Sequence, residues 1–410
     1  MENMNEMTIS EFTDVFNYLL DNNRELQEKG LTPIAIGIEG EAGIGKTSLV
    51  QQVAQKRGMT ICKLNLSQLE EVGDLVGFPQ KEVLLKWKTK EGGTKTIWWP
   101  ENLLSKVPQN VQVTSTTRMG YAPPAWLPKE ENPNGCLVVL DDYTRGNQLF
   151  MQATMELINE GKYISWSLPK NTSIILTTNP DDGSFSVQSL DNAQKTRFIN
   201  FNLKLSINDW ASWAEFNQID SRAINFCLLY GDEIFKKHNN VQTINPRAYT
   251  TFCKAISGIK NWNDDNSLAL ILNISKGCFL NDKDNVVGTL FTTFIAQKLD
   301  KLVQPKDMLM QKWETVEPKI HDCIYEGEHF KTEIASILAL RLLNYIMFYF
   351  SQSGVKEAVV QDRLLEFIDN PRKLFSDDLL FHIIKTVVSK FPTKTTKLLI
   401  NPKIRNKVMV

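Results

Sequence analysis

The sequence predicts an α/β domain with a parallel sheet sandwiched by helices, followed by largely helical material. An apolar run at residues 33–40 precedes a glycine-rich loop, a helical period and a second apolar run at 60–66, which is the order of a β-α-β unit. Further apolar runs continue to about residue 203, and helical periods dominate from about residue 205. At 410 residues the chain is also long for one core, so at least one domain boundary is expected.

A helix is expected first, at residues 8–30. Thr8 and Glu11 have capping-box spacing, apolar residues recur at helical intervals, and Gly30 supplies a stop. The later elements are apolar runs bounded by polar residues or glycine. Strands are expected at 33–40, 60–66, 136–142, 162–168, 172–180 and 196–203, and helices at 46–58 and 147–161.

Residues 70–135 are less regular and indicate an insertion at about 79–100. Two short strands are expected there around a Gly92-Gly93 turn. Trp87, Trp98 and Trp99 lie in this insertion. Two interpretations stay open: an exposed loop that touches a substrate, or a packed hairpin.

Composition excludes several classes of protein. Lys plus Arg total 46 and Asp plus Glu total 47, so overall charge gives no reason to expect binding to nucleic acid or to a membrane surface. The hydrophobic content of 42% is that of an ordinary globular protein. After Asp378 the chain has seven Lys or Arg residues and no acid. A solvated basic tail is the simpler explanation, and contact with nucleic acid or an acidic partner is the alternative.

The remaining sequence signals favour a reducing cytoplasm. The six cysteines have no CxxC pair and no histidine at metal-ligand spacing, which favours buried free thiols. The polar, acidic start MENMNEMTIS does not have the pattern of a secretory signal. The apolar stretch 334–350 is interrupted by Arg341 and Asn344, so a buried helix is expected and no membrane span.

The loop after the first apolar run predicts a phosphate site. GEAGIGKT matches GxxxxGK[ST] in full, between an expected strand and an expected helix. Glycines let successive backbone N–H groups point into one concavity, and the helix N-terminus adds positive potential. Lys46 is expected to neutralise the β and γ phosphates of ATP, and Thr47 to ligate Mg²⁺. The residues expected to line the nucleotide are Gly40, Glu41, Ala42, Gly43, Ile44, Gly45, Lys46, Thr47 and Ser48.

Polar residues at the ends of two later strands supply the other expected groups. Asp141 ends the run LVVLD and is expected to bind the magnesium ion, while Asp142 is expected to act as general base. Thr178 and Asn179 end the run IILTTN, where Asn179 is placed to orient a water between the acid and the γ phosphate. By themselves these pairs would be explained as a solvated turn and an Asn-Pro turn.

Together these residues resemble the AAA+ ATPases, and more narrowly the MoxR-like branch. The resemblance runs from about residue 30 to about residue 260. It is carried by collinear stretches: GEAGIGKTSLV, GDLVGFP, LVVLDDYTRGNQLFMQATMELINEGKY, LPKNTSIILTTNPDDGSFSVQSLDNAQKTRF and INPRAY. It implies a nucleotide-binding domain at 1–204, a helical lid at 205–300 and a helical C-terminal extension at 301–410.

The resemblance also assigns roles to residues. It makes Lys46 and Thr47 the Walker A pair, Asp141 and Asp142 the Walker B pair, and Asn179 the sensor 1 residue. Three arginines follow by position: Arg197 in KTRF as the arginine finger, Arg247 in NPRA as sensor 2 beside the nucleotide, and Arg145 in DDYTRG as a second contact between subunits. An arginine finger completes the active site of the neighbouring subunit, so a ring, hexameric in this family, is expected. Without the resemblance, these arginines would be interpreted as surface charges.

One departure concerns the second acid. The family usually has Asp-Glu at Walker B, whereas this chain has Asp141-Asp142, whose second carboxylate is shorter by one methylene. Catalysis is sensitive to displacements of about 1 Å. Slow hydrolysis, or ATP binding used chiefly as an assembly signal, is therefore an open alternative.

The expected function is that of a MoxR-like ATPase that binds and hydrolyses Mg-ATP between ring subunits to remodel a protein client. Relatives commonly act with von Willebrand factor A domain proteins, which are the first candidates for that client. Three alternatives remain: a nucleic-acid motor, an ATP-binding scaffold with little hydrolysis, and a P-loop kinase or switch. The last should lack arginines at positions such as Arg197 and Arg247.

Overall fold

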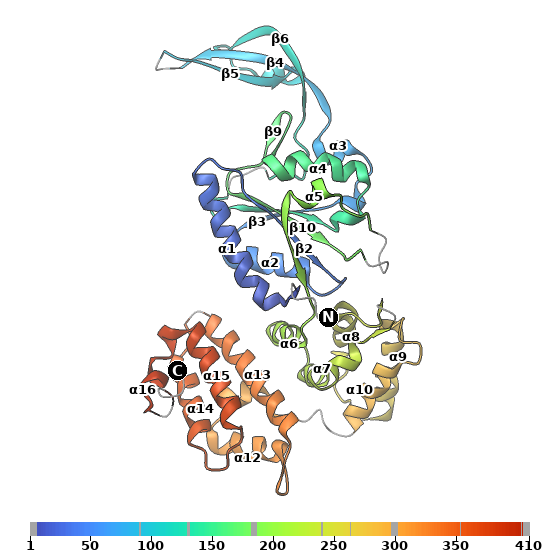
Figure 1. Ribbon diagram of the computed structural model, residues 1–410, viewed down its shortest axis with the longest axis vertical. Coiled ribbons are helices and arrows are strands. Elements are labelled where there is room, and N and C mark those ends of the chain that lie inside the picture. The colour runs from blue at the N-terminus through green and yellow to red at the C-terminus, as the bar shows by residue number, and fades with distance from the viewer. Residues whose placement is uncertain are drawn as a thin grey trace. The chain divides into compact units, whose positions relative to one another are not determined.

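The computed structural model describes residues 6–89, 92–128, 132–181, 187–238, 241–262, 264–296, 302–352, 354–402 and 404. The chain divides into two compact units, Met1–Leu205 and Ser206–Val410. The first is α/β and the second is helical (Figure 1). Lys403, Arg405 and Lys407 of the basic tail lie outside the described residues.

The α/β unit is built on a six-stranded sheet, which confirms the predicted parallel sheet, although its edge strand β1 (Glu6–Met7) was not expected. Its strand pairs are all parallel, in the order β1-β11-β2-β10-β7-β3. Strand β10 therefore lies between β2, which leads into the glycine-rich loop, and β7, which ends at Asp141. The strands are β1 Glu6–Met7, β2 Ala35–Gly40, β3 Thr60–Asn65, β7 Cys136–Asp141, β10 Thr172–Thr178 and β11 Phe198–Leu203.

Helices cover both faces of this sheet because the central strands are apolar on both sides. On one face, Ile36, Ile38 and Val139 pack with α1 (Ile9–Glu28) and α2 (Lys46–Arg57). On the other, Val138 and Leu140 pack with α3 (Val72–Val76) and α4 (Gln148–Glu160). Each fully buried aliphatic side chain of this kind contributes about 1.5–3 kcal/mol.

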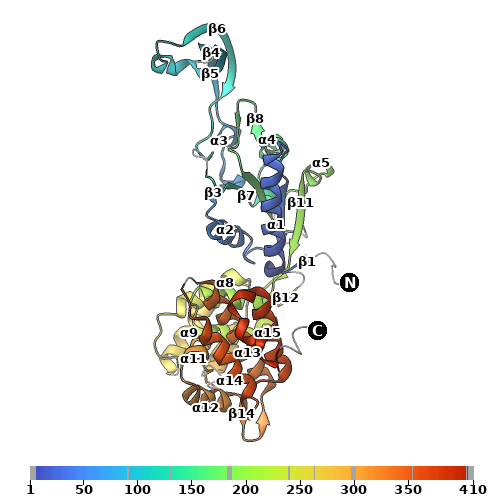
Figure 2. The ribbon, with the colours of Figure 1, turned by 90° about the vertical axis from the view of Figure 1, so that its left-hand side faces the viewer.

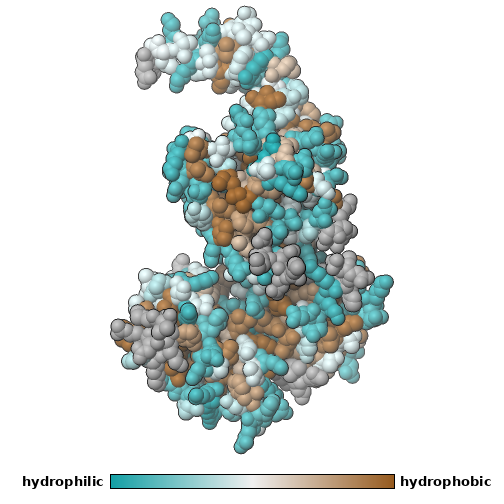
Figure 3. Space-filling view, in the orientation of Figure 1, coloured by the Kyte–Doolittle hydropathy of each residue, from teal (hydrophilic) through white to brown (hydrophobic). Residues whose placement is uncertain are grey.

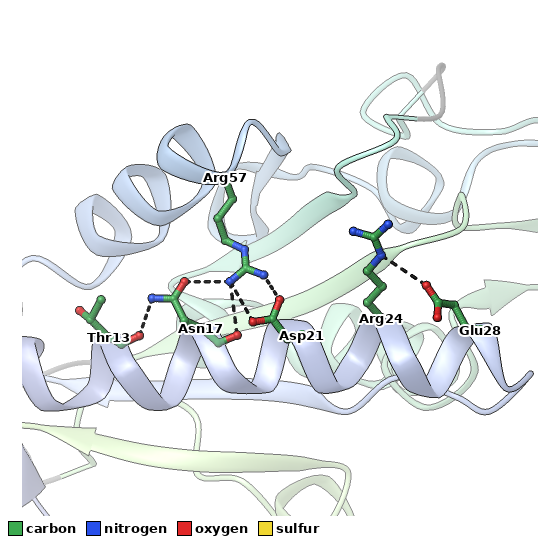
Figure 4. Close-up of polar contacts among 6 residues, drawn as sticks. All are labelled: Thr13, Asn17, Asp21, Arg24, Glu28 and Arg57. Carbon is green, nitrogen blue, oxygen red and sulfur yellow. Dashed lines mark hydrogen bonds and ion pairs between the residues drawn. The ribbon is translucent and has the colours of Figure 1, made fainter. Parts of the chain in front are cut away.

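The first helix begins as its sequence predicts. The Thr8 hydroxyl accepts from the Glu11 N–H, and the Glu11 carboxylate accepts from the Thr8 N–H at 2.8 Å. Arg57, in the last turn of α2, donates to the backbone and side-chain oxygens of Asn17 and pairs with Asp21 (Figure 4). These contacts fix α1 against α2, and therefore against the loop that begins α2.

The insertion is a separate three-stranded antiparallel sheet in the order β5-β4-β6 (Figure 2). The strands β4 (Pro79–Lys88) and β5 (Thr94–Pro100) match the two that were expected, with the 3-10 helix η2 (Glu101–Lys106) after them. Strand β6 (Gln112–Tyr121) was not expected. Its side chains are mostly polar and exposed, so it lacks the alternating apolar pattern that marks a half-buried strand.

Two of the tryptophans are packed within the insertion. Trp99 donates from Nε1 to the carbonyl of Leu103 at 3.0 Å. The Arg118 guanidinium lies 4.5 Å from the centre of the Trp98 ring and bonds the Glu82 carboxylate at 2.8 Å. Both rings are half-buried, which supports the packed-hairpin interpretation for this part of the insertion.

Residues 162–168, expected as one strand, form a tight hairpin of β8 (Lys162–Tyr163) and β9 (Trp166–Ser167). Trp166 explains the difference, because its ring is buried against Trp126 and its Nε1 donates to the carbonyl of Val76 at 2.9 Å. At the turn, the Ser165 hydroxyl accepts from the Tyr121 N–H at 2.6 Å. The hairpin thereby holds the end of β6 beside α4.

The second unit confirms the predicted change to helices after residue 205. Its principal helices are α6 Ile207–Phe216, α7 Ser221–Ile234, α8 Pro246–Ile256, α9 Asp265–Cys278, α10 Val286–Ala296, α11 Pro305–Met310, α12 Trp313–Ile324, α13 Thr332–Ser351, α14 Glu357–Asp369, α15 Asp377–Lys390 and α16 Thr396–Ile400. Two-residue strands form the hairpins β12 Lys237–His238 with β13 Val241–Gln242, and β14 Tyr325–Glu326 with β15 His329–Phe330.

Helix α13 is a core element of the helical unit. It is long and apolar enough to cross a membrane, but 56% of its most apolar window is buried within the structure, where it packs on α6, α11 and α15. Arg341, fully buried on this helix, bonds Glu215 of α6 at 2.5 Å and Asn225 of α7 at 2.8 Å. The apolar stretch is therefore accounted for by burial between helices, as expected.

Candidate nucleotide-binding site

The loop between β2 and α2 has the backbone of a phosphate cradle. Gly43 and Gly45 have φ of 83° and 110°, which side chains rarely adopt. At Gly40, a Cβ would lie 2.6 Å from Cδ1 of Ile44 and 2.9 Å from the carbonyl oxygen of Leu203. Helix α2 begins at Lys46, and its N-cap residue, Gly45, has no side chain that could accept hydrogen bonds from the N–H groups of the first turn. An anion is the natural partner for these donors.

Lys46 lies against this loop and is only 7% exposed. Its Nζ donates to the carbonyl oxygens of Gly40 at 2.5 Å and Glu41 at 3.0 Å, and to Oδ1 of Asn179 at 3.0 Å. Because β10 lies beside β2, the residue that follows β10 reaches the lysine directly. The ammonium is therefore held at the rim of the cradle.

Asp141 is bonded through both carboxylate oxygens. Its Oδ1 accepts from the hydroxyls of Thr47 and Thr177, each at 2.7 Å, and its Oδ2 lies 2.6 Å from Nζ of Lys63. Burial by itself would raise the pKa of Asp141. The hydrogen bonds from Lys63, Thr47 and Thr177, with the charge of Lys63, outweigh burial and place that pKa below its usual value. Asp141 is therefore an ionised carboxylate at neutral pH.

Thr177 and Lys63 were not identified from the sequence. Thr177 is 1% exposed on β10, and its hydroxyl also accepts from the Asp142 N–H at 3.0 Å. One hydroxyl thus fixes both acids. Threonine is common in strands and lysine is common on edge strands, so neither residue forms a motif that a single sequence would reveal.

Asp142 and Asn179 face each other beside this carboxylate. Asp142 has φ 50° and ψ 43°, in the left-handed region, so the chain turns sharply after β7. Asn179 is 4% exposed, and its Nδ2 donates to Oδ1 of Asp142 at 3.2 Å. Its amide therefore bridges Lys46 and Asp142. The assignment of oxygen and nitrogen within the amide follows from this network.

The donor set fits a magnesium nucleotide. The Thr47 hydroxyl and the Asp141 carboxylate present adjacent oxygens 2.7 Å apart, and oxygen is the ligand that Mg²⁺ prefers. They lie at the start of α2, next to the glycine cradle and the Lys46 ammonium. Cation ligands and anion donors are thus adjacent, as a metal-bound phosphate requires.

Of the three arginines named by the resemblance, Arg145 and Arg197 belong to the same unit as this cluster, and Arg247 belongs to the helical unit. Arg197, half-buried before β11, donates from Nη1 to the carbonyl of Ala193 at 2.5 Å. Arg145 is exposed in the 3-10 helix η3 (Tyr143–Arg145). Arg247 is exposed in the first turn of α8, in the helical unit. Within the α/β unit, the structure therefore brings together Lys46, Thr47, Asp141, Asp142 and Asn179, and among the described residues neither Arg145 nor Arg197 hydrogen-bonds to these side chains.

Comparisons with known proteins add little to this geometry. No protein-family model and no curated protein sequence matches the chain. Among solved structures, two mutants of RuvB from Thermotoga maritima align over 95% of this chain. The two alignments cover 81% and 80% of the RuvB chains, with sequence identities of 14% and 12% and TM-scores of 0.29 and 0.28.

Proposed function

We propose that this chain is an AAA+ type ATPase that binds and hydrolyses Mg-ATP. The supporting observation is the convergence of five polar side chains from the cradle, the end of β7 and the end of β10 on one edge of a parallel sheet. Ligands of open α/β sheets bind at the carboxyl ends of the strands.

In this proposal each residue acts according to its present contacts. Lys46 would exchange its carbonyl partners for phosphate oxygens, and Thr47 and Asp141 would hold the magnesium ion. The ion supplies charge neutralisation to the phosphates. Asp142 accepts a proton from water, and Asn179 positions that water by the amide that now bridges Lys46 and Asp142.

We propose further that the active site is completed by a second copy of the chain in a hexameric ring. Arg197 hydrogen-bonds to the backbone of its own chain, and the residue is partly exposed. It is therefore available to reach a γ phosphate across an interface. Arg247, exposed at the start of α8, is proposed to couple the helical unit to the nucleotide.

The proposed client is a protein, with a von Willebrand factor A domain protein as the first candidate because of the MoxR-like motifs. The insertion offers a contact surface. Leu85 of β4 pairs with Ile97 and Val113, and these two and Met119 are exposed. Two exposed lysines lie in the same sheet, since Lys81 is in register with Met119 and Lys95 is two residues before Ile97 on β5. The side of the insertion seen in Figure 3 is mainly hydrophilic. An apolar segment with acidic flanks would suit this surface.

A second candidate is an ATP-binding scaffold with little hydrolysis. It is favoured by the short side chain of Asp142, which is also engaged by Asn179. A glutamate would extend the carboxylate by one methylene toward the attacking water. If the protein is a scaffold, Asp142→Glu should not raise ATP turnover. If it is a motor whose turnover is limited by the distance from the Asp142 carboxylate to the attacking water, Asp142→Glu should raise it.

Steady-state ATP turnover tests these proposals, measured together with size-exclusion chromatography and light scattering. The proteins are the wild type, Lys46→Ala, Asp142→Asn and Arg197→Ala. The ATPase proposal expects turnover in the assembled wild type and a loss of at least about 100-fold in each variant. ATP binding without turnover in an assembled wild type would support the scaffold. Equal turnover by Arg197→Ala in a proven oligomer would disprove the shared site, and stimulation by DNA would favour a nucleic-acid motor.

A further inference from the structure

We propose that Lys63 is a built-in competitor of the metal ion for Asp141, which sets how much Mg²⁺ the site needs. This inference rests on the proposed nucleotide site. Lys63 lies on β3, the strand at the outer side of β7, in register with Val139. From there its Nζ reaches Oδ2 of Asp141 at 2.6 Å, while both threonine hydroxyls use Oδ1.

The two partners differ in burial, and this difference indicates which of them moves. The Asp141 side chain is 10% exposed, whereas the Lys63 side chain is 41% exposed. A carboxylate with so little exposure requires a counter-charge or several donors. The lysine, with a flexible and half-solvated stem, has no such requirement. Lys63 can therefore leave while Asp141 stays, held by Thr47 and Thr177.

The position of the ammonium makes it a rival of a divalent cation. A magnesium ion held between the Thr47 hydroxyl and Asp141 would lie within about 6 Å of Nζ, because both cations approach the same carboxylate. Even with the full dielectric screening of water, a doubly charged ion and an ammonium at this distance repel strongly enough to lower metal affinity about tenfold. In the absence of metal, the same ammonium neutralises the buried carboxylate and stabilises the empty site.

The test compares charge-removing and charge-keeping variants. Lys63→Gln removes the charge but keeps a hydrogen-bond donor, so that the fold is retained, and Lys63→Arg keeps the charge. Lys162→Met is the matched control, because Lys162 forms a 2.7 Å ion pair with Glu160 on the same unit. The fluorescence of mant-ADP bound to each protein is titrated with Mg²⁺ from an EDTA baseline. Thermal unfolding without metal or nucleotide is measured in parallel.

We expect half-saturation of Lys63→Gln at about tenfold lower Mg²⁺, and a lower unfolding temperature in EDTA. Lys63→Arg and Lys162→Met should resemble the wild type. If all four proteins bind mant-ADP but Lys63→Gln needs as much Mg²⁺ as the wild type, or more, the proposed role of Lys63 would be overturned. The proposed nucleotide site would then still stand. If mant-ADP bound to none of the four proteins with Mg²⁺ present, the nucleotide site itself would be disproved and this inference would fall with it.

Discussion

Thr177→Val is the sharpest test of how the two acids are fixed. The substitution keeps the shape of a side chain that is 1% exposed and removes one hydroxyl. That hydroxyl donates to the Asp141 carboxylate at 2.7 Å and accepts from the Asp142 N–H at 3.0 Å. A hydrogen bond to a charged group contributes about 1.5–3 kcal/mol. The loss of the acceptor for a half-buried N–H adds to this, so we expect a cost of about 2–4 kcal/mol.

The next residue provides the control. Thr178 is 2% exposed on the same strand, and its hydroxyl has no hydrogen-bond partner among the described residues. Thr178→Val therefore removes a buried hydroxyl without breaking a bond, and should be neutral or slightly stabilising.

Hydrogen exchange of peptides that cover β7 and β10 measures the local stability without assuming that both units unfold together. We expect protection to fall in Thr177→Val only. Turnover should fall about 10-fold to 100-fold in that variant, because a misplaced acid acts poorly. Equal protection in the two variants would refute the role of the Thr177 hydroxyl.

Three further outcomes follow from the structure. Gly45→Ala should weaken mant-ADP binding and lower the free energy of unfolding by about 1–2 kcal/mol, because φ is 110° and the new Cβ would lie 3.3 Å from Cδ1 of Ile9. A binding titration and calorimetric unfolding measure the two effects. Arg341→Met should destabilise the helical unit by about 3–5 kcal/mol, because Glu215, whose side chain is 10% exposed, loses its partner. Adding Glu215→Gln should restore part of the lost stability, as measured by thermal unfolding. The lowered pKa of Asp141 contributes stability that is present above its ordinary value of 3.8 and is lost as pH falls through the lower, folded-state value. Wild type and Asp141→Asn should therefore differ in urea unfolding at pH 7, and the difference should shrink as the pH falls below 3.8.

The sheet and the cradle could be predicted because each rests on local sequence. Apolar runs of strand length, a glycine loop and polar residues directly after strands are all short-range signals. They place Lys46 after the loop that follows β2, and Asp141 and Asn179 at strand ends, and a parallel sheet then brings those ends to one edge. The prediction of this cluster needed no knowledge of side-chain contacts.

The contacts that hold the cluster could not be predicted, because they depend on strand order. Thr177 touches both acids only because β10 lies directly beside β7, and Lys63 reaches Asp141 only because β3 pairs with the other side of β7. Hydrogen-bond partners across strands are fixed by tertiary pairing, about which a single strand carries little information. Strand β6 was missed for a related reason, since its pairing with β4 stabilises a sequence that has no clear alternating pattern.

The backbone at Asp142 gives a physical reason for the unusual second acid. The residue sits at φ 50° and ψ 43°, a conformation that Asp and Asn adopt more readily than residues with longer side chains, because a short polar side chain can bond locally. Its N–H bonds the Thr177 hydroxyl and its carboxylate accepts from Asn179, so the sharp turn after β7 is held on both sides. A glutamate here would gain reach but would adopt this left-handed conformation less readily. The Asp-Asp pair therefore follows from the local backbone conformation as much as from chemistry, and a slow ATPase is compatible with a fully formed site.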